Sequence, residues 1–103
     1  MPTEVRNNTA LERFEITVDG AVAGYTEYQD TGGERAFVHT EVDPRFDGRG
    51  YARVLVEGAL NATHREGLGA LPMCRQVQQF IETHPPYLSM VPHWARDRLG
   101  MPQ

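Results

Sequence analysis

The fold is decided by the stretch VDPRFDGRGYARVLVE, residues 42–57, where an extended run gives way to a helical one. Pro44 ends the extended run, because proline has no backbone N–H for a strand's hydrogen bonds. Apolar residues recur at helical spacing from Tyr51 onward, and the turn before them contains Gly48 and Gly50. The stretch also carries arginines at intervals of four: Arg45, Arg49 and Arg53. A plain junction needs one glycine at most, so this composition favours a turn that lies against a ligand.

Strand, Gly-x-Gly and helix in this order are typical of an anion site. Glycines let the backbone approach a ligand, and the free N–H groups of the helix's first turn, at Tyr51, carry partial positive charge. Arg49 and Arg53 would add side-chain charge there, and Arg45 could reach it from the loop. A diphosphate is the ligand that best fits such a row. The alternative is that the glycines only satisfy turn dihedrals and the arginines form a solvated face.

Upstream of this turn the chain predicts an antiparallel meander. Residues 13–18 and 21–28 alternate polar and apolar side chains, and Asp19-Gly20 between them favours a two-residue type I′ turn. A second turn, DTGGE, leads to a third extended run, RAFVHTEV, at 35–42. Strict alternation places Phe37, His39 and Glu41 on one face of this run and Val38, Thr40 and Val42 on the other.

Downstream, helical spacing runs from Tyr51 to about Glu66, with Gly67 as the stop. The short apolar run LGALPMC, 68–74, predicts a buried strand, which makes a parallel β-α-β crossover with the strand before the helix. A second helix follows, with Val77, Phe80, Ile81 and His84 on one face. Gly58, in the middle of the first helix, predicts close packing on the sheet.

The fold class that follows is α+β (α/β): a single domain with a mixed sheet, an antiparallel meander, a parallel β-α-β crossover and a second helix. We expect a core from about residue 12 to residue 91. The tail, residues 92–103, is expected to be either a short docked helix or a frayed end.

Length and composition bound the function. A chain of 103 residues suits one domain, and a net charge of −4 argues against a protein that coats nucleic acid or an anionic membrane. No apolar run approaches the ~20 residues that span a bilayer, and the N-terminus lacks the features of a signal peptide. With Cys74 as its one cysteine, the chain can form no internal disulfide, so a cytoplasmic location is expected. We expect a monomer or a small homo-oligomer and no metal site.

Three motifs in order resemble those of a known family. RFDGRG, 45–50, resembles the R/Q-x-x-G-x-G/A loop with which GNAT-type acyltransferases bind the diphosphate of coenzyme A. HTEV, 39–42, precedes it, and LPMCRQVQQFIETHPPYLSMV, 71–91, follows the helix. This arrangement is similar to that of the small GNAT-like N-acetyltransferases with an "HTEV" strand and a "P-x-C…HP-x-Y" segment. The likeness covers approximately residues 12–91.

The resemblance implies a GNAT-like mixed sheet and acetyl-coenzyme A as the cofactor. It implies that Val42 and its neighbours pair with the pantetheine arm, while Gly48, Arg49 and Gly50 hold the diphosphate. Members of this family are truncated relative to full acyltransferases and lack much of the usual acceptor-binding apparatus. The expected cofactor-binding residues are Val42, Arg45, Gly48, Arg49, Gly50, Tyr51 and Arg53.

Cys74, His39 and Glu41 are the candidates for catalysis, and Tyr87 is a further residue with a possible role. Cys74 stands at the start of a helix beside Arg75, where thiolate is stabilised; the alternative is an inert, buried cysteine. The resemblance favours a functional Cys74 that accepts the acetyl group transiently or lines its pocket. His39 or Glu41 could act as the general base for an ammonium acceptor; the alternatives are a structural hydrogen bond for the histidine and a rim salt bridge for the glutamate. Tyr87 could protonate a leaving thiolate or belong to a packed turn.

These residues support one leading hypothesis and two alternatives. The leading hypothesis is an acetyl-coenzyme A-dependent N-acyltransferase that acts on an unidentified amine. A coenzyme A-binding module with little or no turnover is the second. The third is a plain α/β interaction domain in which the loop is only a turn.

Overall fold

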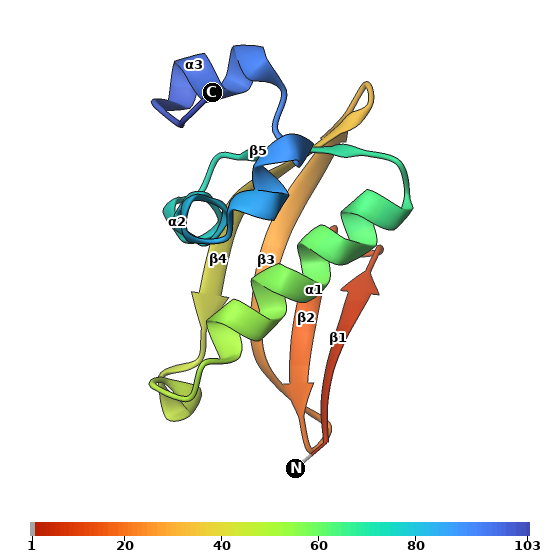
Figure 1. The fold of residues 1–103 in the computed structure, drawn as a ribbon. Coiled ribbons are helices and arrows are strands. Elements are labelled where there is room, and N and C mark those ends of the chain that lie inside the picture. The colour runs from red at the N-terminus through yellow and green to blue at the C-terminus, as the bar shows by residue number, and fades with distance from the viewer. Residues whose placement is uncertain (1) are drawn as a thin grey trace.

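The computed structural model describes residues 2–103, which fold around one five-stranded mixed sheet with the order β1-β2-β3-β4-β5 (Figure 1). The strands are β1 (Thr3–Asn8), β2 (Arg13–Val18), β3 (Ala21–Thr31), β4 (Glu34–Val42) and β5 (Gly69–Pro72). The helices are α1 (Tyr51–Arg65), α2 (Arg75–Thr83) and α3 (His93–Leu99), with short 3-10 helices η1 (Pro44–Phe46) and η2 (Pro85–Met90). None of the helices in this described part has the length and hydropathy that crossing a membrane requires.

The predicted topology is confirmed. Strands β1 to β4 pair antiparallel in sequence order, and β5 joins β4 in parallel after the α1 crossover. Asp19 and Gly20 have φ angles of 51° and 83°, as the type I′ turn between β2 and β3 requires. Gly67 ends α1 with a φ of 76°.

Helix α1 lies across one face of the sheet and buries the core between them (Figure 1). The apolar side chains of β2 alternate toward this face, and the period of α1 brings its own apolar stripe onto them. A Cβ atom added to Gly58 of α1 would lie 3.0 Å from the Cβ of Val5 in β1, so the predicted close packing at this glycine is confirmed. The core residues of these elements are Phe14, Ile16, Val18, Leu55, Val56, Ala59 and Leu60.

One prediction about β4 is wrong. The register against β3 shifts by one residue where Tyr28 pairs with Phe37 and Glu27 with His39, so Val38 is extra. The bulge reverses the alternation, and Phe37 therefore shares the buried, α1-facing side with Thr40 instead of with His39 and Glu41. The exposed face of β4 carries Val38, His39 and Glu41.

Elements at both ends of the chain add to the predicted core. Strand β1 was not predicted from the sequence, and its Val5 packs on the core from the edge of the sheet. The tail is a docked helix, α3, with Ala95 and the following Met101 buried. Arg96 fixes it, because its guanidinium donates to the backbone carbonyls of Leu88 and Val91 at 2.7 and 2.9 Å.

A buried arginine ties the far end of the sheet to the end of α1. Arg35 of β4 is 2% exposed and donates to Asp30, to Glu66 and to the Thr63 hydroxyl. Its guanidinium also lies 4.4 Å from the ring centroid of Tyr28. Burial lowers the pKa of Arg35, but the hydrogen bonds that it donates to Asp30 and Glu66 more than offset this and raise its pKa overall.

Candidate functional site

Strand β4 has a free edge over its second half. Its pairing with β5 ends where Phe37 meets Pro72, and the Cys74 N–H then donates to the Phe37 carbonyl at 2.9 Å. The chain turns away at this point into α2, which begins at Arg75. The backbone of residues 38–42 is therefore paired with β3 alone, and its other side opens into a gap between β4 and α2.

A cleft of about 340 Å³ occupies this gap. The Gln76 carboxamide reaches across from α2 and donates to the Thr40 carbonyl at 3.4 Å. This contact shows that Thr40 directs its carbonyl to the cleft, and Val42, two residues on, directs its backbone the same way. The cleft is lined by Thr40, Glu41, Val42, Asp47, Ala52 and Gln76.

The glycine turn presents its backbone beside this cleft. Gly48 and Gly50 have φ angles of 76° and 77°, and a Cβ atom added to either would meet nothing within 4 Å. Gly50 is the N-cap of α1 and offers no side chain to the first-turn N–H groups, and that turn holds no acidic residue. The positive end of the α1 dipole is thus open to an anion. Tyr51, at the first position of α1, is half-buried with its ring edge-on to Phe46.

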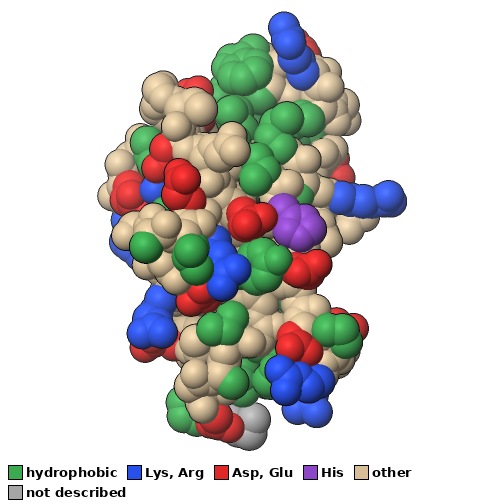
Figure 2. Space-filling view, turned by 180° about the vertical axis from the view of Figure 1, so that it is seen from behind, with side chains coloured by type: hydrophobic (Ala, Val, Ile, Leu, Met, Phe, Trp, Pro, Cys, Tyr) green, Lys and Arg blue, Asp and Glu red, His purple; other side chains and the backbone are tan. Residues whose placement is uncertain are grey.

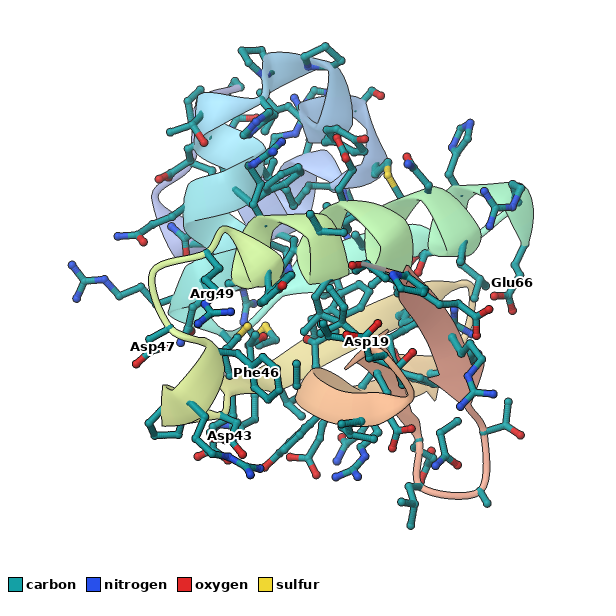
Figure 3. The ribbon with its side chains drawn as sticks, turned by 90° about the horizontal axis from the view of Figure 1, so that it is seen from below. Asp19, Asp43, Phe46, Asp47, Arg49 and Glu66 are labelled. Atoms are coloured by element: carbon teal, nitrogen blue, oxygen red, sulfur yellow. The ribbon has the colours of Figure 1, made fainter. Side chains whose placement is uncertain are left out.

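The three arginines of the turn differ in their partners. Arg49 and Arg53 are exposed, and neither side chain forms a hydrogen bond or an ion pair within residues 2–103. Arg45 instead pairs with Asp43, whose Oδ2 accepts from its Nη2 at 2.8 Å. Donation from Arg45 lowers the pKa of the Asp43 carboxyl. Figure 3 shows Arg49 beside the start of α1 and Asp43 below it, just before η1. Free positive charge at the turn therefore comes from Arg49 and Arg53.

A second groove continues the cleft between α1 and α2. Its volume is about 490 Å³, and Ala52 and Gln76 line both it and the cleft. Val56 and Phe80 contribute apolar wall, and Arg53 lies at its α1 side. The two hollows together run from the free edge of β4, past the first turn of α1, to the outer surface of both helices.

Cys74 lies behind the cleft wall. It is 8% exposed, and its Sγ is 3.2 Å from the Thr40 Oγ1, which is itself 2.9 Å from the Thr26 Oγ1. The residue is the N-cap of α2, as the sequence predicts, but its side chain makes no capping hydrogen bond. The sequence left open whether Cys74 is buried. In the structure it is buried, and Thr40 lies between its thiol and the cleft.

Glu41 and His39 lie on the opposite face of the sheet from Cys74, because successive β4 side chains alternate. The Glu41 Oε2 accepts a hydrogen bond of 2.8 Å from the Tyr25 hydroxyl, and its Oε1 lies 3.7 Å from the His39 Nε2. The pKa of Tyr25 is raised, chiefly by its hydrogen bond to Glu41. Partial burial and the negative charges of Glu41 and Glu27 raise it further, whereas the positive charge of Arg13 lowers it. Figure 2 shows this face with acidic side chains beside a histidine.

His84 and Tyr87 of the C-terminal segment have structural contacts. His84 is the C-cap of α2, where its Nδ1 lies 2.8 Å from the Phe80 carbonyl and its ring stacks on Phe80. The Tyr87 hydroxyl donates to the Asn61 Oδ1 at 3.0 Å, and its ring packs edge-on against Phe80. His84 also lines the α1–α2 groove, and neither residue lines the cleft at the free edge of β4.

Two residues of the site escaped the sequence analysis. Tyr25 reaches Glu41 only because β3 pairs with β4 in this register. The one signal in the sequence was the spacing of Tyr25 and Glu27, which places both side chains on one face of the strand. Gln76 reaches Thr40 only because β5 is short and α2 starts early. Neither residue type carries a motif that would mark it in the sequence.

Comparison with known proteins identifies the family. No curated protein matches the chain. The model of a protein family described as GCN5-related N-acetyl-transferase matches residues 13–90, which is more than half of the chain and includes β4, the glycine turn, α1, β5 and α2. The mixed sheet and the β-α-β crossover agree with that fold. The chain therefore belongs to the GCN5-related N-acetyltransferases, a family of acyl-group-transferring proteins.

Proposed function

We propose that the chain is a single acyl-coenzyme A-binding domain and an acetyl-coenzyme A-dependent N-acyltransferase that acts on an amine. One observation carries this proposal: the open positive end of α1 lies beside the free edge of β4. The first feature suits a diphosphate, and the second offers unpaired backbone groups to the amides of an extended arm. Coenzyme A combines these two chemical groups in one molecule.

The residues present fit the cofactor. Gly48 and Gly50 leave open the space that a Cβ would fill, so the turn's backbone can approach a diphosphate, and Arg49 and Arg53 supply free charge. Backbone groups of Thr40 and Val42 would hold the pantetheine arm once Gln76 releases the Thr40 carbonyl. The apolar groove between α1 and α2 would take the adenosine end. Arg45 would join the site only by exchanging its bonds with Asp43.

When bound, acetyl-coenzyme A supplies an acetyl group activated as a thioester. The chain supplies a proton acceptor, since Glu41 lies at the cleft and can take the proton that an ammonium acceptor must lose before it is a nucleophile. His39, 3.7 Å from Glu41, can pass that proton to solvent. Burial of Cys74 behind Thr40 favours a lining role over transient acylation.

A coenzyme A-binding domain with little turnover is the second candidate function. It is favoured by the bare sheet face around Glu41, where no described helix encloses an acceptor (Figure 2). Turnover on a panel of amines separates the two candidates. We expect Cys74→Ser to retain both cofactor binding and turnover, and loss of turnover alone would instead assign acyl transfer to the thiol.

The proposal is tested by calorimetric titration of acetyl-coenzyme A into the parent chain and two glycine variants. Gly48→Ala places a Cβ in the cradle, whereas Gly67→Ala places one in the turn after α1. The two glycines have the same φ of 76° and the same open surroundings, so backbone strain is matched. We expect saturable binding to the parent, unchanged binding to Gly67→Ala and at least a tenfold weaker affinity in Gly48→Ala.

Either of two results would overturn the proposal. Absence of binding to the parent would mean that the glycine turn is only a turn. Equal weakening by both substitutions would mean that strain, and not the position of the cradle, controls affinity. A further check is salt: if Arg49 and Arg53 contact phosphate, raising the ionic strength weakens binding to the parent.

A further inference from the structure

We propose that the acceptor is a small primary alkylamine, bound as its ammonium ion on the helix-free face of the sheet with its nitrogen at the Glu41 carboxylate and the Tyr25 hydroxyl. This inference rests on the proposed function and names the acceptor's chemical class and its site. The starting observation is a hollow of about 540 Å³ on that face, within the size range of small-molecule sites. It is lined by Arg13, Val22, Ala23, Gly24, Tyr25, Glu41, Val42, Asp43 and Pro44.

The hollow meets the cofactor cleft at the edge of the sheet. Glu41 and Val42 line both spaces, one on each side of β4's free edge. Since β5 ends opposite Phe37, no strand separates the two spaces beyond that point. An acceptor held in the hollow therefore has its reactive end at the same residue, Glu41, that borders the cleft. Transfer between two ligands needs such a meeting point, because the reacting atoms must come within about 3–3.5 Å.

The charges of the hollow select a cation. Arg13 is paired with Glu15 at 2.9 Å and lies over the Tyr25 ring, 4.4 Å from its centroid, and Asp43 is paired with Arg45 at 2.8 Å, so both side chains of the hollow already have partners. Glu41 has no arginine partner among the described residues; its neighbours are the Tyr25 hydroxyl and the His39 ring. One carboxylate is thus left with free lone pairs, on a side chain that is 61% exposed. A carboxylate and a phenol oxygen together suit the three donors of a primary ammonium group.

The rest of the hollow suits an alkyl chain. Its floor is made by the small residues Ala23 and Gly24, with Val22 beside them, 42% exposed. A Cβ on Gly24 would lie 2.8 Å from the Glu41 carbonyl oxygen, so close pairing of β3 with β4 keeps this floor flat. Methylene groups laid on the exposed Val22 side chain would remove apolar surface from water on both partners.

The test is an NMR titration of the cofactor-free chain with n-butylamine at neutral pH, with n-butanol as the uncharged probe. We expect saturable shifts of the Tyr25, Glu41 and Val42 amides with the amine and none with the alcohol. Glu41→Gln is expected to weaken amine binding about tenfold, since one charge-assisted contact is lost. Glu27→Gln is the matched control, because Glu27 lies on the same face of the sheet but does not line the hollow. The affinity of this variant for n-butylamine should stay within twofold of the parent's.

Tyr25→Phe gives an independent check should Glu41→Gln perturb the fold, and a threefold or greater loss of amine affinity is expected. The inference is overturned if the shifts map elsewhere, if butanol binds equally, or if both glutamate variants behave alike. Tighter binding of Nα-acetyl-lysine N-methylamide than of butylamine, by tenfold or more, would overturn the small-molecule assignment in favour of a peptide side chain. Because the titration omits coenzyme A, its outcome is independent of cofactor binding. The acceptor site can therefore be disproved while the cofactor site is supported, and the cofactor site can be disproved while the acceptor site is supported.

Discussion

At the scale of single residues, the Tyr25–Glu41 hydrogen bond makes a prediction about pH. The hydrogen bond that the Tyr25 hydroxyl donates to Glu41 raises the pKa of Tyr25 above its ordinary value of 10.0. In Glu41→Gln the carboxylate charge is gone, so we expect the Tyr25 pKa to fall toward that value. Titration of the tyrosine ring carbons by ¹³C NMR measures it directly. An unchanged pKa in the variant would show that the bond is not populated in solution.

The same hydrogen bond gives stability a definite dependence on pH. A group whose folded pKa is raised stabilises the folded state below its unfolded pKa, and this contribution disappears as the pH rises through the folded pKa. The parent's free energy of unfolding is therefore expected to fall more steeply than that of Glu41→Gln above about pH 10. At neutral pH Tyr25 remains a donor, which keeps Glu41 oriented at the junction of the hollow and the cleft.

At the scale of elements, the contact of α1 with β1 decides whether Gly58→Ala stabilises or destabilises the fold. Gly58→Ala should gain about 1 kcal/mol from helix propensity alone. In the parent, however, the new Cβ would lie 3.0 Å from the Cβ and Cγ1 atoms of Val5, so we expect the gain to vanish or reverse. In a Val5→Gly background these atoms are absent, and Gly58→Ala should stabilise. Urea unfolding of all four chains gives the coupling energy; equal effects in both backgrounds would show that β1 yields freely.

Elements that depend on a few neighbouring residues could be predicted from the sequence, and those that depend on pairing with distant strands could not. Asp19-Gly20 and the turn at Gly48 are local signals, and both were predicted from a few residues. The bulge at Val38 was not, because RAFVHTEV alternates regularly and only its pairing with β3 inserts the extra residue. Strand β1 was missed because TEVRNN, at residues 3–8, is a polar edge strand with one apolar residue on the core.

The candidate site divides in the same way. Its cradle is contiguous in sequence and could be predicted together with β4. Its other parts depend on distant pairs: Gln76 with Thr40, and Tyr25 with Glu41, which are separated by 36 and 16 residues. Burial of Cys74 likewise depends on how α2 packs beside β4, which the helical period of α2 alone does not specify. Tertiary arrangement supplied what local pattern could not.

At the scale of the whole molecule, the buried Arg35 and the proposed cofactor turn lie at opposite ends of α1. Figure 3 shows Arg49 near the start of this helix and Glu66 near its end. Glu66 and Asp30 hold the buried Arg35, which joins the outer end of the sheet to α1. Since the glycine turn and Arg35 share no contact among the described residues, a change at one end of α1 should leave the other intact.

Arg35→Ala is accordingly expected to lower the free energy of unfolding by about 3 kcal/mol, because it removes a buried cation with its charge-assisted bonds and its packing on Tyr28. Arg6→Ala is the matched control: Arg6 also pairs with a carboxylate, Glu4 at 3.1 Å, but both side chains are 64% exposed, so the loss should be below about 0.5 kcal/mol. Urea unfolding measures both, and calorimetry at a temperature where both variants are folded should give the parent's affinity for acetyl-coenzyme A. Equal stability losses would contradict a structural role for Arg35, whereas a weakened cofactor affinity in Arg35→Ala would show that the two ends of α1 are coupled.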